Sequence, residues 1–298
     1  MALFVIKVLI INSKTMTASN SNTEKEYKDW EWLKENNPWK KEIFNDEPKN
    51  ILGRLLKWEE GEFVYSEDKA FIDNRNNVLA NSKKKKDNVF KTSLLPKPYR
   101  GNLKDPKLVI LSLNPGYNER TKKKMFEMLN EKYQLKFIEI AKKNALLEDG
   151  CSIMPDDNED SEGYWVDVVT DNGYWLDKLS DIINEPNVDI SKIGLIQFIP
   201  YASKHYDSWE KEDELETQKF SVDIIRRLLY KDESTLFLVM RAKKQWDKLL
   251  RKYNIELDKE EFSQRFLYNN NPICQKISYD NIGEVQYERI KTALTFKG

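Results

Sequence analysis

An apolar run over Leu108–Leu113, which ends abruptly at Asn114-Pro115-Gly116-Tyr117, constrains the fold most strongly. A run of this length without alternation is typical of a strand buried on both faces, as in a parallel sheet. Pro115 has no N–H to donate to a neighbouring strand and Gly116 permits a positive φ, so we expect the strand to end here. Asn114 is then the first polar side chain past the strand, at the place where ligands bind in open α/β sheets.

Three further strand-like runs follow, and each precedes a stretch with helical character. They are Ile193–Ile199, Thr235–Met240 and Arg265–Tyr268. Strands that alternate with helices predict right-handed crossovers and a parallel sheet covered on both faces. We therefore predict a three-layer α/β/α fold with a four-stranded, mainly parallel central sheet. The polar clusters lie at the carboxyl ends of these strands and should converge on one edge of the sheet.

The chain divides into three predicted parts. Residues 1–22 are expected to form a flexible N-terminal extension, residues 23–93 a helical region packed on the core, and residues 94–298 the α/β domain, with an insertion at about 118–170. Pro38 and Pro48 should break the helical region into short pieces. Its candidate core positions are Trp30, Leu33, Ile43, Ile51, Leu55 and Leu56.

Further helices are predicted within the α/β domain. Arg120–Leu147 is expected to form one long helix, Tyr174–Ile183 an amphipathic helix after a turn at Asp171-Asn172-Gly173, and Asp280–Phe296 a closing helix. The inward positions expected for the long helix are Met125, Met128, Leu129, Phe137, Ile140 and Ala141.

Composition and motif content argue against several classes of function. The formal net charge is -1, so nucleic-acid binding can only come from local patches. Cys151 and Cys274 supply neither a disulfide framework nor a metal-ligand cluster, which predicts a cytoplasmic protein without metal. The chain has no GxxxxGK(S/T), GxGxxG or GxSxG motif, so no cofactor is predicted. Ala2–Ile11 is shorter than the ~20 residues that span a bilayer, so no membrane contact is expected.

The motif order resembles that of the uracil-DNA glycosylase superfamily, and most closely its mismatch-specific uracil/thymine-DNA glycosylase branch. Asn114-Pro115-Gly116 matches the first motif, and Asn271-Pro272 with Ser278 resembles the second. The resemblance covers roughly residues 94–298. Weaker likenesses between the two motifs are Gly173-Tyr174-Trp175 and Val239-Met240-Arg241-Ala242 with Trp246.

This resemblance implies catalytic roles for Asn114, Asn271 and His205. Uracil enzymes carry Asp in the first motif; Asn is neutral and cannot act as a general base, although its amide can position a water. The second motif of those enzymes supplies a His, where this chain has Asn271. His205, the only histidine, is either a substitute for that His or a structural or surface residue.

The resemblance also implies a set of substrate contacts. Uracil enzymes place Tyr directly after the Pro of the first motif, where its ring excludes a 5-substituent; Gly116 opens this space and displaces Tyr117 by one position. Bulkier 5-substituted pyrimidines should therefore be tolerated. Trp175 is as compatible with a core position as with a base contact. The expected substrate-binding residues are Pro115, Gly116, Tyr117, Tyr174, Trp175, Ser203 and Pro272.

Cations near the predicted strand ends are candidates for contacts to DNA phosphates, and equally for solvated surface charges. They are Arg100, Arg120, Lys204, Arg241, Lys243 and Lys244, with Lys122, Lys123 and Lys124 nearby. The expected partner is DNA, either a duplex with a flipped base or a single strand, and the protein is expected to be a monomer.

The leading hypothesis is a monofunctional DNA glycosylase that hydrolyses the N-glycosidic bond of a modified or mispaired base, in DNA repair or in defence against phage DNA. The alternative is a catalytically inactive module of the same fold that binds nucleic acid or a nucleotide. A third class is a metal-dependent nuclease that uses the acidic loop Asp156–Glu162, although a solvated loop is the simpler interpretation of that run.

Overall fold

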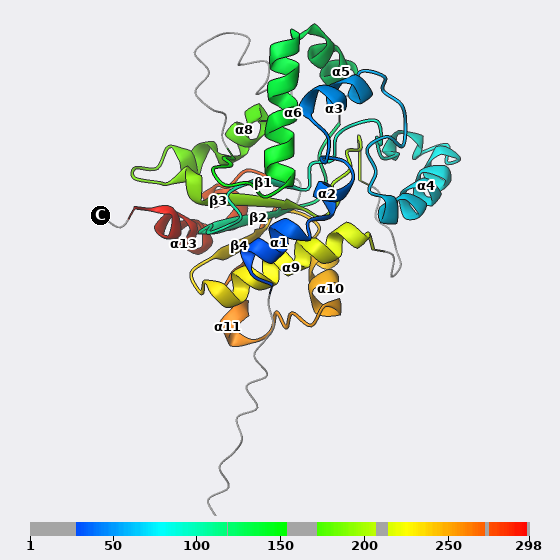
Figure 1. Cartoon of the computed structure of the whole chain (residues 1–298). Helices are drawn as coiled ribbons and strands as arrows, with labels where there is room; N and C mark the ends of the chain where they lie inside the picture. Colours follow the sequence, from blue (N-terminus) through cyan, green and yellow to red (C-terminus); the bar gives the residue numbers. More distant parts are fainter. Residues whose placement is uncertain (1–27, 118, 154–171, 207–213, 272–273, 297–298) are drawn as a thin grey trace, which may run out of the picture.

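A computed structural model places β2 (Leu108–Ser112) at the centre of a five-stranded sheet with the order β1-β3-β2-β4-β5 (Figure 1). The structure describes residues 28–117, 119–153, 172–206, 214–271 and 274–296. The other strands are β1 (Tyr99–Gly101), β3 (Ile193–Gln197), β4 (Leu236–Val239) and β5 (Phe266–Tyr268). All four predicted strands are present, and β2 is buried along its whole length.

The prediction of four strands was wrong, because β1 adds an antiparallel edge strand to the parallel set. The sheet of the described residues is therefore mixed. Gly101 faces Gly194 across the β1–β3 pair, and Gly101 has a φ of +71°. A Cβ on Gly194 would lie 2.3 Å from the carbonyl oxygen of Asn102. The strand therefore forms only because two glycines let the backbones approach closely.

The strand order defines where a ligand can bind. From β2 the chain moves to β3 on one side, and it then crosses to β4 on the other side of β2. Connections leave β2 and β4 in opposite directions, so the topological switch point lies between the carboxyl ends of these two strands. In open α/β sheets, ligands bind in the crevice at this point. We call the edge formed by the carboxyl ends of β2 to β5 the carboxyl rim.

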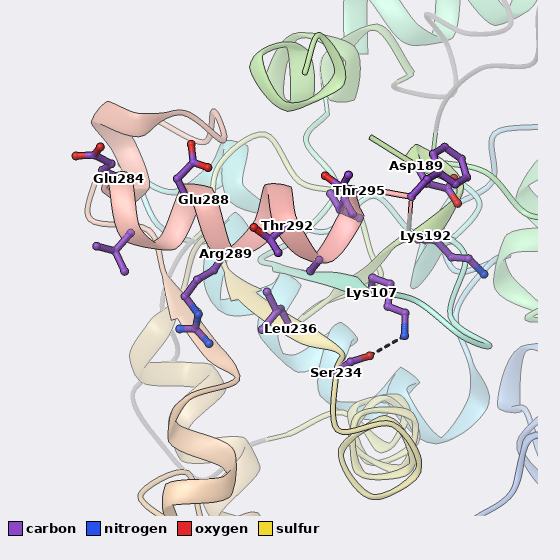
Figure 2. Close-up of a pocket in the computed structure, with 14 residues that line it drawn as sticks. Lys107, Asp189, Lys192, Ser234, Leu236, Glu284, Glu288, Arg289, Thr292 and Thr295 are labelled. Atoms are coloured by element: carbon purple, nitrogen blue, oxygen red, sulfur yellow. Dashed lines mark hydrogen bonds between the residues drawn. The ribbon is translucent and has the colours of Figure 1, made fainter. Parts of the chain in front are cut away.

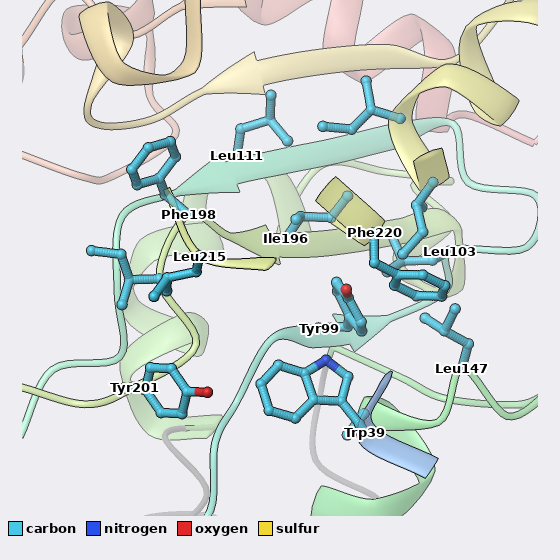
Figure 3. Close-up of a cluster of buried hydrophobic side chains, with 14 of the residues drawn as sticks. Trp39, Tyr99, Leu103, Leu111, Leu147, Ile196, Phe198, Tyr201, Leu215 and Phe220 are labelled. Carbon is cyan, nitrogen blue, oxygen red and sulfur yellow. The ribbon is translucent and has the colours of Figure 1, made fainter. Parts of the chain in front are cut away.

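Helices cover both faces of the sheet, as the alternation of side chains along β2 shows. Val109 and Leu111 belong to the core that α9 (Glu216–Lys231) and α10 (Lys243–Lys252) share, part of which appears in Figure 3. Leu108 and Ile110 face the opposite way, toward α8 (Asn172–Ile183) and α13 (Glu284–Leu294). The arrangement is an α/β fold that is compatible with three layers.

The N-terminal region is helical, as predicted, and packs on the first of these cores. Pro38 and Pro48 are each the first residue of a helix, where a missing N–H costs nothing. Its elements are α1 (Trp30–Glu35), α2 (Pro38–Lys41), α3 (Pro48–Leu55), α4 (Ser66–Ala80) and η1 (Lys86–Asn88). The predicted core residues are buried except Leu56, which is 45% exposed because it caps the end of α3.

Two predicted helices are interrupted. The stretch 120–147 consists of α5 (Glu119–Met128) and α6 (Glu131–Ala145), because Asn130 caps α6 by accepting a hydrogen bond from the Tyr133 amide. Met128, predicted to face inward, is 83% exposed beside this break. The closing helix consists of α12 (Tyr279–Ile282) and α13, which Gly283 separates with a φ of +83°. The remaining short elements are η2 (Ile190–Lys192) and α11 (Glu260–Ser263).

A buried carboxylate connects the N-terminal region to the sheet. Oδ2 of Asp68 on α4 accepts hydrogen bonds from the Tyr201 hydroxyl at 2.8 Å and the Thr217 hydroxyl at 2.7 Å. Its Oδ1 accepts the backbone N–H of Thr217 at 3.2 Å, so Asp68 caps the first turn of α9. Burial outweighs these donors and raises the pKa of Asp68 to about 6.

None of the helices in the described part of the chain has the length and apolar character needed to cross a membrane.

Candidate functional site

The turn after β2 is held by the segment that follows β3. Ser203 donates its backbone N–H to the Pro115 carbonyl at 3.3 Å, and its own carbonyl accepts the Tyr117 N–H at 3.2 Å. Gly116 therefore forms a parallel bridge with Ser203, and the two chains stay paired beyond the strand. Gly116 is absent from the glycines with positive φ in the described residues, so the prediction that its φ ends the strand was wrong. The end of the regular strand rests on Pro115.

The side chain of Asn114 has a defined orientation at this turn. Its Nδ2 donates to the Ser203 hydroxyl at 2.9 Å and to the Pro115 carbonyl at 3.2 Å. The Ser203 hydroxyl donates its single proton to the His205 carbonyl at 3.0 Å, so it can only accept from Asn114. No described residue donates to Oδ1 of Asn114, a half-buried side chain. This oxygen is therefore available at the carboxyl rim to accept a hydrogen bond from a water or a ligand.

Gln197 is a site residue that the sequence reasoning missed. It ends β3 directly beside Ser112 and is 7% exposed. No described residue donates a hydrogen bond to its buried Oε1. A buried acceptor left unpaired costs about 1–3 kcal/mol, so it marks a place where a ligand or water supplies the donor. The available signal was a single amide at the end of an otherwise apolar strand.

A cavity of about 50 Å³ adjoins Gln197, and we call it the amide cavity. Pro115, Trp175, Arg100 and Asn144 also line it. Trp175 is 4% exposed and belongs to the core under α8, so the core interpretation of this residue holds and its indole forms part of the cavity lining. Tyr174 is exposed and donates its hydroxyl proton to Oε1 of Gln275 at 2.8 Å.

A second cavity of about 40 Å³ adjoins the other side of the same turn, and we call it the apolar cavity. Gly116, Tyr117, Trp58, Phe126 and Ala202 are among the residues that line it. A Cβ built on Gly116 meets no atom within 4 Å, so the space that the sequence predicted beside this glycine exists. Both small cavities therefore meet at the Pro115–Gly116 turn.

The structure does not bring Asn271 into hydrogen-bonding reach of Asn114. Asn271 follows β5, and β4 lies between β5 and β2, which corresponds to about 10 Å at the usual strand spacing. Its Oδ1 accepts the Cys274 N–H at 3.2 Å, and its Nδ2 donates to Asn281 at 3.3 Å. The Asn271 amide thus orders its own loop. Pro272 lies outside the described residues.

His205 contributes its backbone carbonyl to the site, through the hydrogen bond from Ser203. Its imidazole is exposed, and no described residue forms a hydrogen bond with it. The substitution of this ring for the missing catalytic His therefore remains a prediction.

The predicted phosphate-binding cations separate into groups. Arg100 lies in β1, where it is buried and lines the amide cavity, and the side chain of Arg120 is not described. Lys204 pairs with Asp87 at 2.9 Å, which holds the pKa of that carboxyl below its ordinary value. Lys243 pairs with Asp247 at 2.6 Å and lies over the Tyr268 ring.

Arg241 and Lys244 follow β4, beside the switch point. In the described chain, neither forms an ion pair. These two side chains are the cations of the predicted set that remain available to a phosphate.

A larger cavity of about 930 Å³ lies at the opposite end of the sheet (Figure 2). It runs along α13 beside the amino ends of β2 and β4, where ligands seldom bind in such folds. Its lysines are already engaged: Lys107 bonds Ser234 at 2.6 Å, and Lys192 pairs with Asp105 at 2.7 Å. We therefore place the candidate site at the carboxyl rim, despite the greater volume here.

The acidic loop Asp156–Glu162 lies outside the described residues, so the nuclease alternative stays untested. Elsewhere in the described chain, no three His, Cys, Asp or Glu side chains gather as a metal site would require. Comparison with known proteins found no matching family model, no matching curated protein and no matching solved structure.

Proposed function

We propose that this protein is a monofunctional DNA glycosylase that hydrolyses the N-glycosidic bond of a flipped, modified or mispaired pyrimidine. The observation that carries the proposal is the fixed carboxamide of Asn114 at the switch point. Its Nδ2 is occupied by Ser203 and Pro115, which leaves Oδ1 to accept from a water. The resemblance of Asn114-Pro115-Gly116 to the first glycosylase motif supports the same residue on independent grounds.

The reaction requires little of the protein besides positioning and electrostatics. The bond between the anomeric carbon and the base breaks, the base leaves with the electron pair, and a water oxygen bonds to the oxocarbenium-like sugar. Asn114 is neutral, so it orients this water without taking its proton. The water becomes acidic enough to lose its proton to solvent once it has bonded to the cationic carbon. The departing base carries negative charge, which donors in the site must stabilise.

Gln197 fits the recognition of a base edge in this proposal. A carboxamide offers one acceptor and two donors, and a pyrimidine edge presents the complementary groups. The unpaired Oε1 of Gln197 would accept from a ring N–H, with the buried Trp175 beside it. Flipping a base costs a few kcal/mol, which pairing with such a buried amide helps to offset.

The proposal is tested by incubating the protein with DNAs that carry different modified or mispaired bases, followed by mass spectrometry of the released bases. We expect release of at least one free base and an alkali-labile abasic site, without strand cleavage by the protein and without loss of activity in EDTA. Asn114→Ala should lose turnover and keep DNA binding. Asn50→Ala, at an exposed position of α3, is the matched control and should retain both.

A binding module without catalysis is the second candidate. It is favoured by the absence of any carboxylate among the described residues that line the two small cavities. Nothing there can accept the proton of the attacking water. If every base panel leaves intact DNA while Gln197→Ala weakens binding of a pyrimidine nucleotide, the binding module is the better account and the glycosylase proposal is wrong.

A further inference from the structure

We infer that the apolar cavity receives a small apolar substituent on the ring that Gln197 reads, so that the protein selects pyrimidines with a methyl- or ethyl-sized group. This inference rests on the proposed function for the identity of the ring. The cavity itself, with its apolar chemistry, is independent of that function.

The lining of the cavity excludes a polar occupant. Leu55, Leu95, Phe126, Phe137 and Ala202 are buried apolar residues around it. Among the described residues that line it, none carries a carboxyl or a carboxamide group. A volume of about 40 Å³ would hold roughly three water molecules, but a water needs two to four polar partners to enter stably. A group of one or two carbon atoms fits this space and needs none.

The two lysines in the lining contribute their stems, because their ammonium groups lie over aromatic rings. Lys123 Nζ lies 4.9 Å from the centroid of the Trp58 ring, and Lys97 Nζ lies 5.9 Å from that of Phe137. A lysine in this position buries its methylene groups along the apolar surface and keeps its charge at the periphery. The aromatic part of the lining is itself packed, with the Trp58 and Phe126 rings edge to face at 6.0 Å.

The N-terminal region builds one side of this cavity. Leu55 ends α3 and Trp58 follows it, whereas Gly116 belongs to the turn after β2. Lys91 fixes the relative position of these parts through an antiparallel bridge with Ala202 and a contact of its Nζ with the Tyr117 ring at 5.9 Å. The part of the chain that precedes the α/β domain thus contributes to ligand selection.

The position of the turn connects the two cavities into one ligand description. Pro115 lines the amide cavity, the next residue lines the apolar cavity, and Lys97 lines both. Gly116 is exposed, and it presents no side chain between them. A ligand that occupies both cavities therefore has a hydrogen-bonding ring edge and a short apolar substituent. A 5-alkylated pyrimidine has this chemistry.

The first test asks whether the cavity binds an apolar probe at all, and it needs no catalysis. The full-length protein is placed under xenon pressure, and bound xenon is measured by ¹²⁹Xe NMR. We expect saturable binding to the native protein and its loss in Gly116→Leu, whose side chain fills the space. Val78→Leu, at an exposed position of α4 outside the cavity, should bind xenon as the native protein does. Xenon that fails to bind, or binds equally to Gly116→Leu, would overturn the inference.

The second test compares DNAs that differ only in the substituent at the 5-position: hydrogen, methyl, ethyl or hydroxymethyl. One methyl group in a fitted apolar pocket changes kcat/KM by about 10–200-fold, so the methyl base should exceed uracil by such a factor. The hydroxymethyl base should fall below the ethyl base, because its hydroxyl finds no partner. In Gly116→Leu the ratio of methyl base to uracil should collapse toward unity.

The outcomes separate this inference from the proposed function. If xenon binds as expected but no base is released, the glycosylase proposal fails and the apolar cavity stands. If bases are released with equal kcat/KM for hydrogen and methyl, the substituent inference is wrong whatever xenon does.

Discussion

The hydroxyl group of Ser203 holds the amide of Asn114 in one of its two possible orientations. Nδ2 of Asn114 donates to Oγ of Ser203 at 2.9 Å, and the same Oγ donates to the His205 carbonyl. An exchange of the nitrogen and oxygen of Asn114 would place two acceptors against each other. Ser203, predicted as a substrate contact, is 1% exposed and therefore acts on the site through Asn114.

Ser203→Ala should lower kcat by up to about 100-fold while KM changes little, because the water that Asn114 orients loses its defined position. Removal of the hydroxyl should also cost about 1–2 kcal/mol of stability. Single-turnover excision and urea unfolding measure the two effects. Ser203→Thr should recover most of kcat, and Ser263→Ala, which removes an exposed hydroxyl on α11, should alter neither quantity. Recovery of stability without kcat in Ser203→Thr would contradict a positioning role.

Arg241 and Lys244 should each contribute to DNA binding through phosphates. Replacing both with Gln should reduce the slope of log K against log salt concentration by about 0.9 for each phosphate that is no longer neutralised. Lys231→Gln is the matched control, because Lys231 ends α9 near the amino end of β4, away from the carboxyl rim. Binding isotherms on duplex and single-stranded DNA between low and moderate salt measure the slope. An equal reduction in the control would show that these charges act through net charge alone.

Asp68 should make stability depend on pH. Burial raises its pKa in the folded protein from an ordinary 3.8 to about 6, so the native state keeps this proton to higher pH than the unfolded chain does. The stabilising contribution is fully present below about pH 4 and is lost as pH rises through 6, by at most about 3 kcal/mol. Urea unfolding across pH 4 to 7 measures it. Asp68→Asn should show a flatter profile over this range; an unchanged slope would assign the dependence to another group.

Gly194→Ala should destabilise the protein by about 1–3 kcal/mol, because the new Cβ would overlap the Asn102 carbonyl oxygen. Gly53→Ala provides the contrast: Gly53 lies in α3, and a Cβ there meets no atom within 4 Å. This second change should stabilise by up to about 1 kcal/mol through helix propensity. Thermal unfolding of the two variants measures the difference. Equal effects would mean that β1 and β3 separate at little cost.

The parallel strands could be predicted because each is buried on both faces and leaves a continuous apolar signature, as in Leu108–Leu113. The edge strand β1 could not. It has three residues, lies close to Pro96 and Pro98, and depends on a close approach between Gly101 and Gly194 that only the folded chain reveals. The break at Asn130 was missed for a related reason, since one capping side chain outweighed a pattern that otherwise favours a continuous helix.

The candidate site was predictable where it follows one strand and unpredictable where it depends on strand order. Asn114 was found because a polar residue after an apolar run marks a carboxyl end. Gln197 was missed because its apolar neighbours on both sides hide a single amide. Asn271 was paired with Asn114 by motif order, but β4 lies between their strands, and no local pattern specifies which strands are adjacent.

The carboxylate of Asp68 begins a helix that starts 149 residues later in the chain. The first turn of α9 is therefore completed by a contact that forms only after a very large loop has closed, and such contacts are reached slowly during folding. The docking of α4 and the final ordering of α9 should occur in one step. A chain deprived of its first 93 residues would leave the Thr217 N–H without its acceptor in the interior, and the sheet would lose a part of its own nucleation. For this protein, the helical N-terminal region belongs to the folding unit.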